Sequence, residues 1–184
     1  MWEDLQLADR ATDSEFLRSL DQKKRPAGYA SAVVDRVIDG DTFVITHGDI
    51  THIRLQGVDS PEVRTREGRA AREAVKGLLK QGDSVRLYNI ETQAGSDMFN
   101  ERIVALVLLG NKLLNEEIVR LGWAVPTAHL FNVPKAEATR IRDAMFEAQS
   151  KKLGLWKLFP GSEFLKPYNA LGDIGSFPEI DNLE

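Results

Sequence analysis

The chain of 184 residues contains no cysteine, only three histidines, and no long apolar run. The absence of cysteine excludes disulfides, thiolate metal sites and cysteine nucleophiles. No apolar stretch approaches the roughly 20 residues that span a bilayer, so we expect no membrane partner. The N-terminal stretch MWEDLQLADR is acidic and mixed, unlike a secretory signal. We therefore expect a cytoplasmic location unless a leader precedes this sequence.

The chain also lacks an overall excess of basic charge, because its formal net charge is −4. That value argues weakly against a nucleic-acid partner, but the distribution of charge matters more. Residues 30–156 carry equal numbers of acidic and basic side chains, and the stretch RTREGRAAREAVK gathers Arg64, Arg66, Arg69, Arg72 and Lys76. Two interpretations stay open: a basic face that attracts phosphates, or a solvated helix surface.

The order of the apolar patterns predicts the fold class. Strands are expected over 29–38, around a hairpin turn at His47–Asp49, and over 84–90 and 102–110. Helices are expected at about 65–80, over 112–122 and from Pro134 onward. This order favours an α+β, mainly β protein: a five-stranded OB-type Greek-key barrel with about three helices.

The pattern also suggests three parts of the chain. Residues 1–28 form an N-terminal extension with a short helix at TDSEFLRSL, residues 29–157 form the barrel domain, and residues 158–184 form a C-terminal tail with several aromatic side chains.

Acidic side chains flank the second and third predicted strands. Asp41 precedes one strand, while Asp59 and Glu62 follow the other, with Arg54 near its end. A cluster of carboxylate oxygens favours a hard cation such as Ca²⁺ or Mg²⁺. A guanidinium binds phosphate with two hydrogen bonds, so acids, cation and arginine together suit phosphodiester cleavage.

This arrangement has a geometric condition. Arg54 and Asp59 are five residues apart, so a regular strand points their side chains to opposite faces. They converge if the chain bends or bulges at Gly57, a residue type that permits either, or if the strand ends early. Taken singly, these residues also have simpler interpretations, namely turn acids and one half of a structural ion pair.

Four segments occur in a fixed order: VIDGDTF, IRLQGVDSPE, ALVLLGNKLLNEEIVRLGWA and KKLGLW. Together they resemble the staphylococcal nuclease (thermonuclease-like) family over about residues 30–156. The resemblance implies that Asp41 and Asp59 bind Ca²⁺, with Mg²⁺ or Mn²⁺ as alternatives, and that Ser60 adds its main-chain carbonyl. By the same pattern Glu62 holds the attacking water, Arg54 stabilises the transition state, and Asp39 is a nearby acid outside the ligand set.

Three further site residues follow from the resemblance. The second family arginine is matched to Arg102, although SDMFNER has an extra residue and Asn100-Glu101 replace a single glycine. His129 and Phe131 fall where the family has tyrosines beside the nucleotide. Phe131 can stack on a base but cannot donate a hydroxyl hydrogen bond.

The resemblance implies a calcium-dependent nuclease that hydrolyses DNA and RNA, prefers single strands and leaves 3′-phosphate ends. The alternative is a non-catalytic nucleic-acid-binding module on the same fold. A third hypothesis is a protein-interaction subunit that uses the aromatic tail. The sequence leaves the oligomeric state open.

Overall fold

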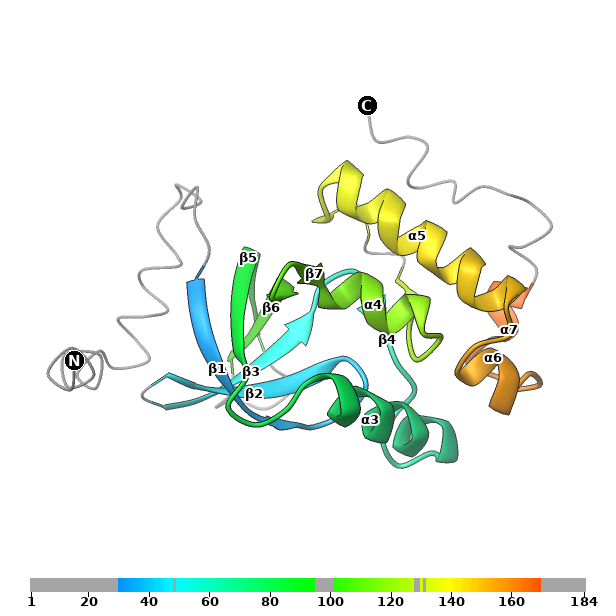
Figure 1. The fold of residues 1–184 in the computed structure, drawn as a ribbon, viewed down its shortest axis with the longest axis horizontal. Coiled ribbons are helices and arrows are strands. Elements are labelled where there is room, and N and C mark those ends of the chain that lie inside the picture. The colour runs from blue at the N-terminus through cyan, green and yellow to red at the C-terminus, as the bar shows by residue number, and fades with distance from the viewer. Residues whose placement is uncertain (1–29, 48, 95–100, 128–129, 131, 170–184) are drawn as a thin grey trace, which may run out of the picture.

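The computed structural model describes residues 30–47, 49–94, 101–127, 130 and 132–169. The helix expected at TDSEFLRSL lies outside these residues. The main sheet has the order β3-β2-β1-β5-β6, extended at β6 by the two-residue strand β7 (Lys112–Leu113), and a parallel pairing of β3 with β6 closes the first five strands into a barrel (Figure 1). These five strands are β1 Ala30–Val37, β2 Thr42–His47, β3 Asp49–Leu55, β5 Ser84–Ala94 and β6 Glu101–Leu109. The predicted five-stranded OB-type barrel is confirmed.

Alternating side chains fill the barrel interior. Val34, Phe43, Ile45 and Ile53 are buried, and they come from three consecutive strands. The predicted hairpin is confirmed, because β2 and β3 pair antiparallel up to the His47–Asp49 pair. Phe43 and Ile45 stand two positions apart on β2, as expected for side chains on one face of a strand.

The three predicted helices are also present. They are α3 Arg66–Leu78, α4 Leu114–Arg120 and α5 Lys135–Ser150, and the short helices α6 Leu155–Leu158 and α7 Lys166–Asn169 follow. Pro134 occupies the N-cap of α5, and the predicted inward face of that helix is buried at Ala138, Ile141, Met145 and Ala148. Three two-residue strands complete the described elements: β4 Val58–Asp59, β7 Lys112–Leu113 and β8 Val125–Pro126.

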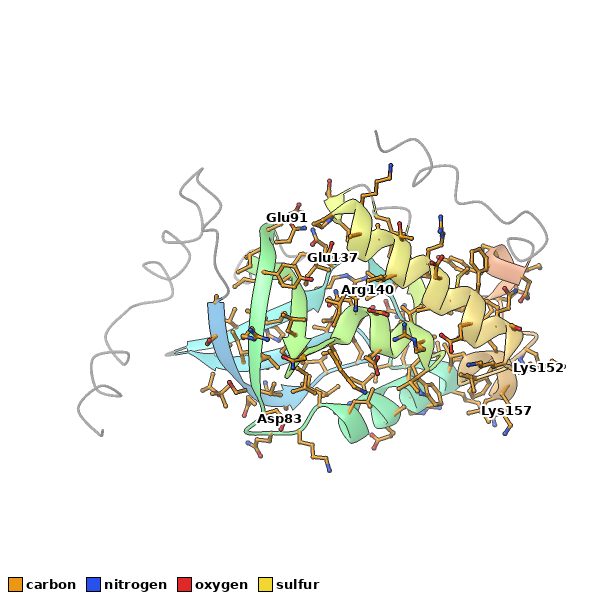
Figure 2. The ribbon with its side chains drawn as sticks, turned by 45° about the horizontal axis from the view of Figure 1, so that its top comes forward. Asp83, Glu91, Glu137, Arg140, Lys152 and Lys157 are labelled. Carbon is orange, nitrogen blue, oxygen red and sulfur yellow. The ribbon has the colours of Figure 1, made fainter. Side chains whose placement is uncertain are left out.

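Helix α4 lies between the barrel strands and α5, while α3 lies apart from α5, on the lower side of the strands in Figure 1. Ion pairs join α4 to α5, because Glu116 is buried and pairs with Arg120 on its own helix and with Arg140 on α5. Figure 2 shows Arg140 pointing from α5 toward α4. The Arg140 pair therefore joins α5 to α4.

The chain beyond α6 continues the packed structure up to residue 169. Leu165 is completely buried, and Phe159, Phe164 and Tyr168 pack against the core. Among the described residues, the structure has no helix with the length and apolar character needed to cross a membrane.

Candidate active site

Arg54 lies between two carboxylates at one end of the barrel. Its Nη1 donates a hydrogen bond of 3.0 Å to Asp41 Oδ1, and its Nη2 donates one of 2.7 Å to Asp59 Oδ1. Arg54 is near the end of β3 and pairs with Thr42 at the start of β2, so the cluster sits where these strands meet. The structure thus brings together three of the residues singled out from the sequence.

A turn at Gly57 makes this convergence possible. Strand β3 ends at Leu55, and Gly57 has a φ of +73°, a conformation that glycine adopts without steric cost. The chain then enters β4, which pairs with β8 instead of continuing the barrel strand. The predicted bend at Gly57 is confirmed, and it turns Asp59 back toward Arg54.

Asp41 is held in place by its neighbours on every side. Its Oδ2 accepts a hydrogen bond of 2.8 Å from the Ser60 main-chain N–H, and its Oδ1 accepts one of 2.9 Å from the Thr42 hydroxyl. Gly40 allows this approach, since a Cβ atom there would lie 2.7 Å from the Ser60 side chain. The role of Thr42 was not predicted from the segment VIDGDTF. A hydroxyl next to an acidic residue is a possible hydrogen-bond donor to it.

The charge on Asp41 is poorly compensated. Burial raises the pKa of the Asp41 carboxyl to about 7; Arg54 opposes this shift, while nearby Asp39 adds to it by repulsion. Burial lowers the pKa of Arg54, but the attraction of Asp41 and Asp59 outweighs burial, so its pKa is raised overall. Burial is the main cause, so the ionised form of Asp41 is disfavoured even with the Arg54 guanidinium beside it.

The donor set and its charge fit a calcium ion. Asp41 and Asp59 offer carboxylate oxygens and Ser60 a main-chain carbonyl, which are ligand types that Ca²⁺ prefers. A divalent cation would also favour the ionised form of Asp41, which burial disfavours. Within the part of the chain that the structure describes, no three acidic or histidine side chains converge into a metal-binding group. Most of the roughly six to eight oxygens that Ca²⁺ takes would then have to be main-chain or water oxygens.

Glu62 lies just beyond this cluster, in the turn that leads into α3. Its side chain is exposed, and no hydrogen bond to its carboxylate is recorded among the described residues. Its main-chain carbonyl, in contrast, accepts hydrogen bonds from Thr65. The carboxylate is thus open to solvent while the main chain is fixed.

The remaining predicted site residues are only partly described. Arg102 lies on β6 opposite Gln93 of β5. Two residues further along β6, Val104 pairs with Arg54. The side chain of Arg102 is not described. His129 and Phe131 lie outside the described residues.

The segment around these two positions is tied to the Gly57 turn. The Thr127 N–H donates to the Gly57 carbonyl at 3.0 Å, and the Asn132 carbonyl accepts a 2.9 Å hydrogen bond from the Asn89 side chain and one of 3.4 Å from Gln56. Thr127 and Asn132, on either side of the two predicted positions, are therefore held beside the turn that leads to Asp59.

Fold and site together define an OB-type barrel protein with an acid–arginine cluster at one barrel end. The model of the family described as staphylococcal nuclease homologue matches residues 52–158, more than half of the chain. The chain is 34% identical over 135 residues to the thermonuclease of Staphylococcus intermedius, covering 69% of this chain and 76% of that protein. The chain belongs to the staphylococcal nuclease family.

A second relative is much longer than this chain. Endonuclease YhcR of Bacillus subtilis (strain 168) is 26% identical over 164 residues, which are 82% of this chain. The matched region spans only 13% of that protein. The similarity thus concerns one segment of a larger molecule.

Proposed function

We propose that this chain is a calcium-dependent nuclease that hydrolyses phosphodiester bonds in DNA and RNA, prefers single strands and leaves 3′-phosphate ends. The observation that carries the proposal is the placement of Arg54 between Asp41 and Asp59, with the exposed Glu62 close by in sequence. Membership of the family and the names of the two relatives support a nuclease.

Arg54 has the geometry to bind the phosphate that reacts. Its guanidinium makes one hydrogen bond to each of two acids, so its planar fork is already oriented at the barrel end. A phosphate that replaces Asp59 as a partner gains a charge-assisted hydrogen bond. As negative charge accumulates on the phosphoryl oxygens in the transition state, the same fork stabilises it.

Glu62 has the exposure needed to hold the attacking water. Its carboxylate accepts a hydrogen bond from the water and thereby orients the water oxygen toward phosphorus. The new bond forms between that oxygen and phosphorus, the bond from phosphorus to the 5′-oxygen breaks, and a proton ends on the departing 5′-oxygen. The products are a 3′-phosphate and a 5′-hydroxyl.

Asp41, Asp59 and the Ser60 carbonyl are the residues that would hold calcium. When bound, this ion supplies electrostatic stabilisation of a phosphoryl oxygen. The hydrogen bonds from Thr42 and from the Ser60 N–H keep Asp41 in one orientation, so this ligand is prepared before the ion arrives.

The proposed preference for single strands rests on the segment that carries His129 and Phe131. An unpaired base exposes its ring face, and Phe131 offers a stacking partner for it. Stacking does not depend on base identity or on the sugar, which fits action on both DNA and RNA.

Glu62→Gln is the variant that tests this proposal. The change is nearly isosteric but removes the negative charge, so cleavage of single-stranded DNA should slow by about 10²–10⁴-fold. Binding should stay equal or become tighter, because an anion near the phosphates is removed. Both quantities are measured in one Ca²⁺ buffer at one ionic strength, with EDTA as the metal-free control and analysis of the product ends.

A non-catalytic binding module on the same fold gives a different result. Such a module binds single-stranded DNA without cutting it, both as wild type and as Glu62→Gln. Wild-type protein that never cleaves DNA or RNA in Ca²⁺, Mg²⁺ or Mn²⁺ would overturn the nuclease proposal.

A further inference from the structure

The turn between Glu62 and α3 is closed by hydrogen bonds onto a single carbonyl. The Glu62 main-chain oxygen accepts one bond from the Thr65 N–H and one from the Thr65 hydroxyl, both of 2.8 Å. The same hydroxyl oxygen accepts a 2.9 Å hydrogen bond from the Gly68 N–H. Thr65 thus links the main chain of Glu62 directly to the first turn of α3.

Gly68 brings the helix into contact with this carbonyl. A Cβ atom at position 68 would lie 2.0 Å from the Glu62 oxygen, 2.4 Å from its carbonyl carbon and 2.5 Å from the Pro61 oxygen. All three neighbours are main-chain atoms, so no side-chain rotation can relieve the overlap. Any residue larger than glycine must move either the turn or the helix.

The helix that carries these contacts is itself fixed. Ala71, Val75 and Leu79, on the inward face and at the C-terminal end of α3, are buried. Ala71 also lies beside the turn at Gly40. A Cβ atom added to Gly40 would be 3.1 Å from the Ala71 Cβ. Helix α3 therefore connects the Glu62 main chain to the turn that holds Asp41.

We infer that Thr65 and Gly68 are positioning residues for Glu62, which hold its main chain against α3 and so limit the region that its carboxylate reaches. This inference rests on the proposed function of Glu62. An exposed glutamate has three rotatable side-chain bonds, so a fixed main chain is what limits the region its carboxylate reaches. Misplacing a reacting group by about 1 Å can cost about 10²-fold in rate.

A plain helix cap would explain only part of this geometry. An N-cap hydroxyl needs to accept a hydrogen bond from the second or third helical N–H, as it does from Gly68. Here the Thr65 hydroxyl also donates a hydrogen bond to the Glu62 carbonyl. Gly68 lies so close to this carbonyl that a Cβ atom at position 68 would overlap with it. Loss of a cap lowers stability, whereas loss of positioning lowers the rate of cleavage through Glu62.

Thr65→Val separates these roles, with Thr65→Ser as the conservative partner. Valine keeps the shape but removes both hydroxyl hydrogen bonds, so kcat on a single-stranded DNA oligonucleotide should fall by about 10- to 100-fold with little change in KM. Serine retains the hydroxyl and should keep most of the rate. In a Glu62→Gln background, Thr65→Val should cause little further loss, because the group that it positions is already inactive.

Gly68→Ala is tested against Gly77→Ala on the same helix. A Cβ at Gly77 meets no atom within 4 Å, so Gly77→Ala should leave kcat unchanged and raise the melting temperature through better helix propensity. Gly68→Ala should lower kcat by at least about tenfold. Equal effects of the two alanines on kcat would overturn the inference.

A measurement without catalysis keeps this inference apart from the proposed function. Amide hydrogen exchange of full-length protein reports the Thr65 and Gly68 N–H groups directly. Thr65→Val should speed exchange at Gly68 at least tenfold while core amides stay protected. If Glu62→Gln cleaves like wild type, the proposed function fails alone. If Glu62→Gln is slow but Thr65→Val cleaves and exchanges like wild type, the positioning role fails alone.

Discussion

Arg54 has two carboxylate partners, and they differ in exposure. The Asp41 side chain is 3% exposed, whereas that of Asp59 is 44% exposed. An exposed ion pair contributes little free energy, so Asp59 is the partner that an incoming phosphate replaces more easily. Asp41 is buried and bonded to Ser60 and Thr42, and it keeps one half of the guanidinium fork in place.

Replacing Arg54 with lysine should therefore be costly. Arg54→Lys keeps the charge but cannot donate to Asp41 and a phosphate in fixed directions, and we expect turnover to fall at least about 10²-fold. Arg102→Lys should cost no more than that. Single-turnover rates on one oligonucleotide measure both variants, and a nearly silent Arg54→Lys contradicts the role given to Arg54.

The same cluster makes a prediction about calcium. Asp41→Ala and Asp59→Ala each remove a carboxylate from the proposed ligand set, so each should weaken Ca²⁺ affinity while the fold stays intact. Isothermal titration calorimetry gives the affinities, and circular dichroism checks the fold. Glu73→Ala is the control, because this exposed acid pairs with Lys76 on α3. Unchanged affinity in both aspartate variants would refute the ligand assignment.

At the scale of elements, local patterns predicted the strands and helices well. The turn at Gly57 followed from the need to bring Arg54 and Asp59 together, and the inward face of α5 followed from its spacing. The contact of Gly68 with Glu62 was not predictable, because a glycine in a helix usually only lowers helix propensity. The positions of His129 and Phe131 and the side chain of Arg102 stay predictions.

Helix α3 and the turn before it carry the basic side chains noted in the sequence. Arg64, Arg66 and Arg69 are exposed, and the Arg69 side chain donates to the Arg64 carbonyl at 2.9 Å. This link places a basic surface next to the turn that holds Glu62. A strand of nucleic acid that reaches the cluster can place further phosphates against this surface.

Neutralising two of these arginines tests this surface. Arg66→Gln with Arg69→Gln should reduce the slope of log affinity against log salt by up to about 1.4 for single-stranded DNA, about 0.7 for each lost phosphate contact. The matched control changes Lys152 and Lys157 to glutamine; Figure 2 shows both near the C-terminal end of α5. Fluorescence anisotropy at several salt concentrations measures the slopes, and equal slopes for both double variants refute a specific role for α3.

At the scale of the whole molecule, the C-terminal segment is integrated with the family domain up to residue 169. The Gln149 side chain donates to the Tyr168 carbonyl at 3.5 Å, and the Phe164 and Tyr168 rings have centroids 6.5 Å apart. Burial raises the pKa of Tyr168, and the charge of Asp59 adds to this effect. The sequence alone does not predict where these aromatic residues pack, because their partners are residues distant in the chain.

Leu165 should therefore matter for stability and Leu158 should not. Leu165 is 0% exposed and Leu158 is 54% exposed. Leu165→Ala should lower the free energy of unfolding by about 2–5 kcal/mol, while Leu158→Ala should change it by less than about 0.5 kcal/mol. Urea denaturation compares the two leucine variants with wild type. An equal, small effect of both would mean that the segment after α6 contributes little to the fold.

Closure of the barrel has a consequence for the newly made protein. Arg54 lies on β3, whose parallel partner β6 is synthesised about 50 residues later and pairs Ile103 with Ile53. Until β6 leaves the ribosome, β3 lacks one neighbour and the end of the barrel that holds Arg54 is open. The barrel end that holds Arg54 therefore cannot be completed before β6 has been synthesised and has paired with β3.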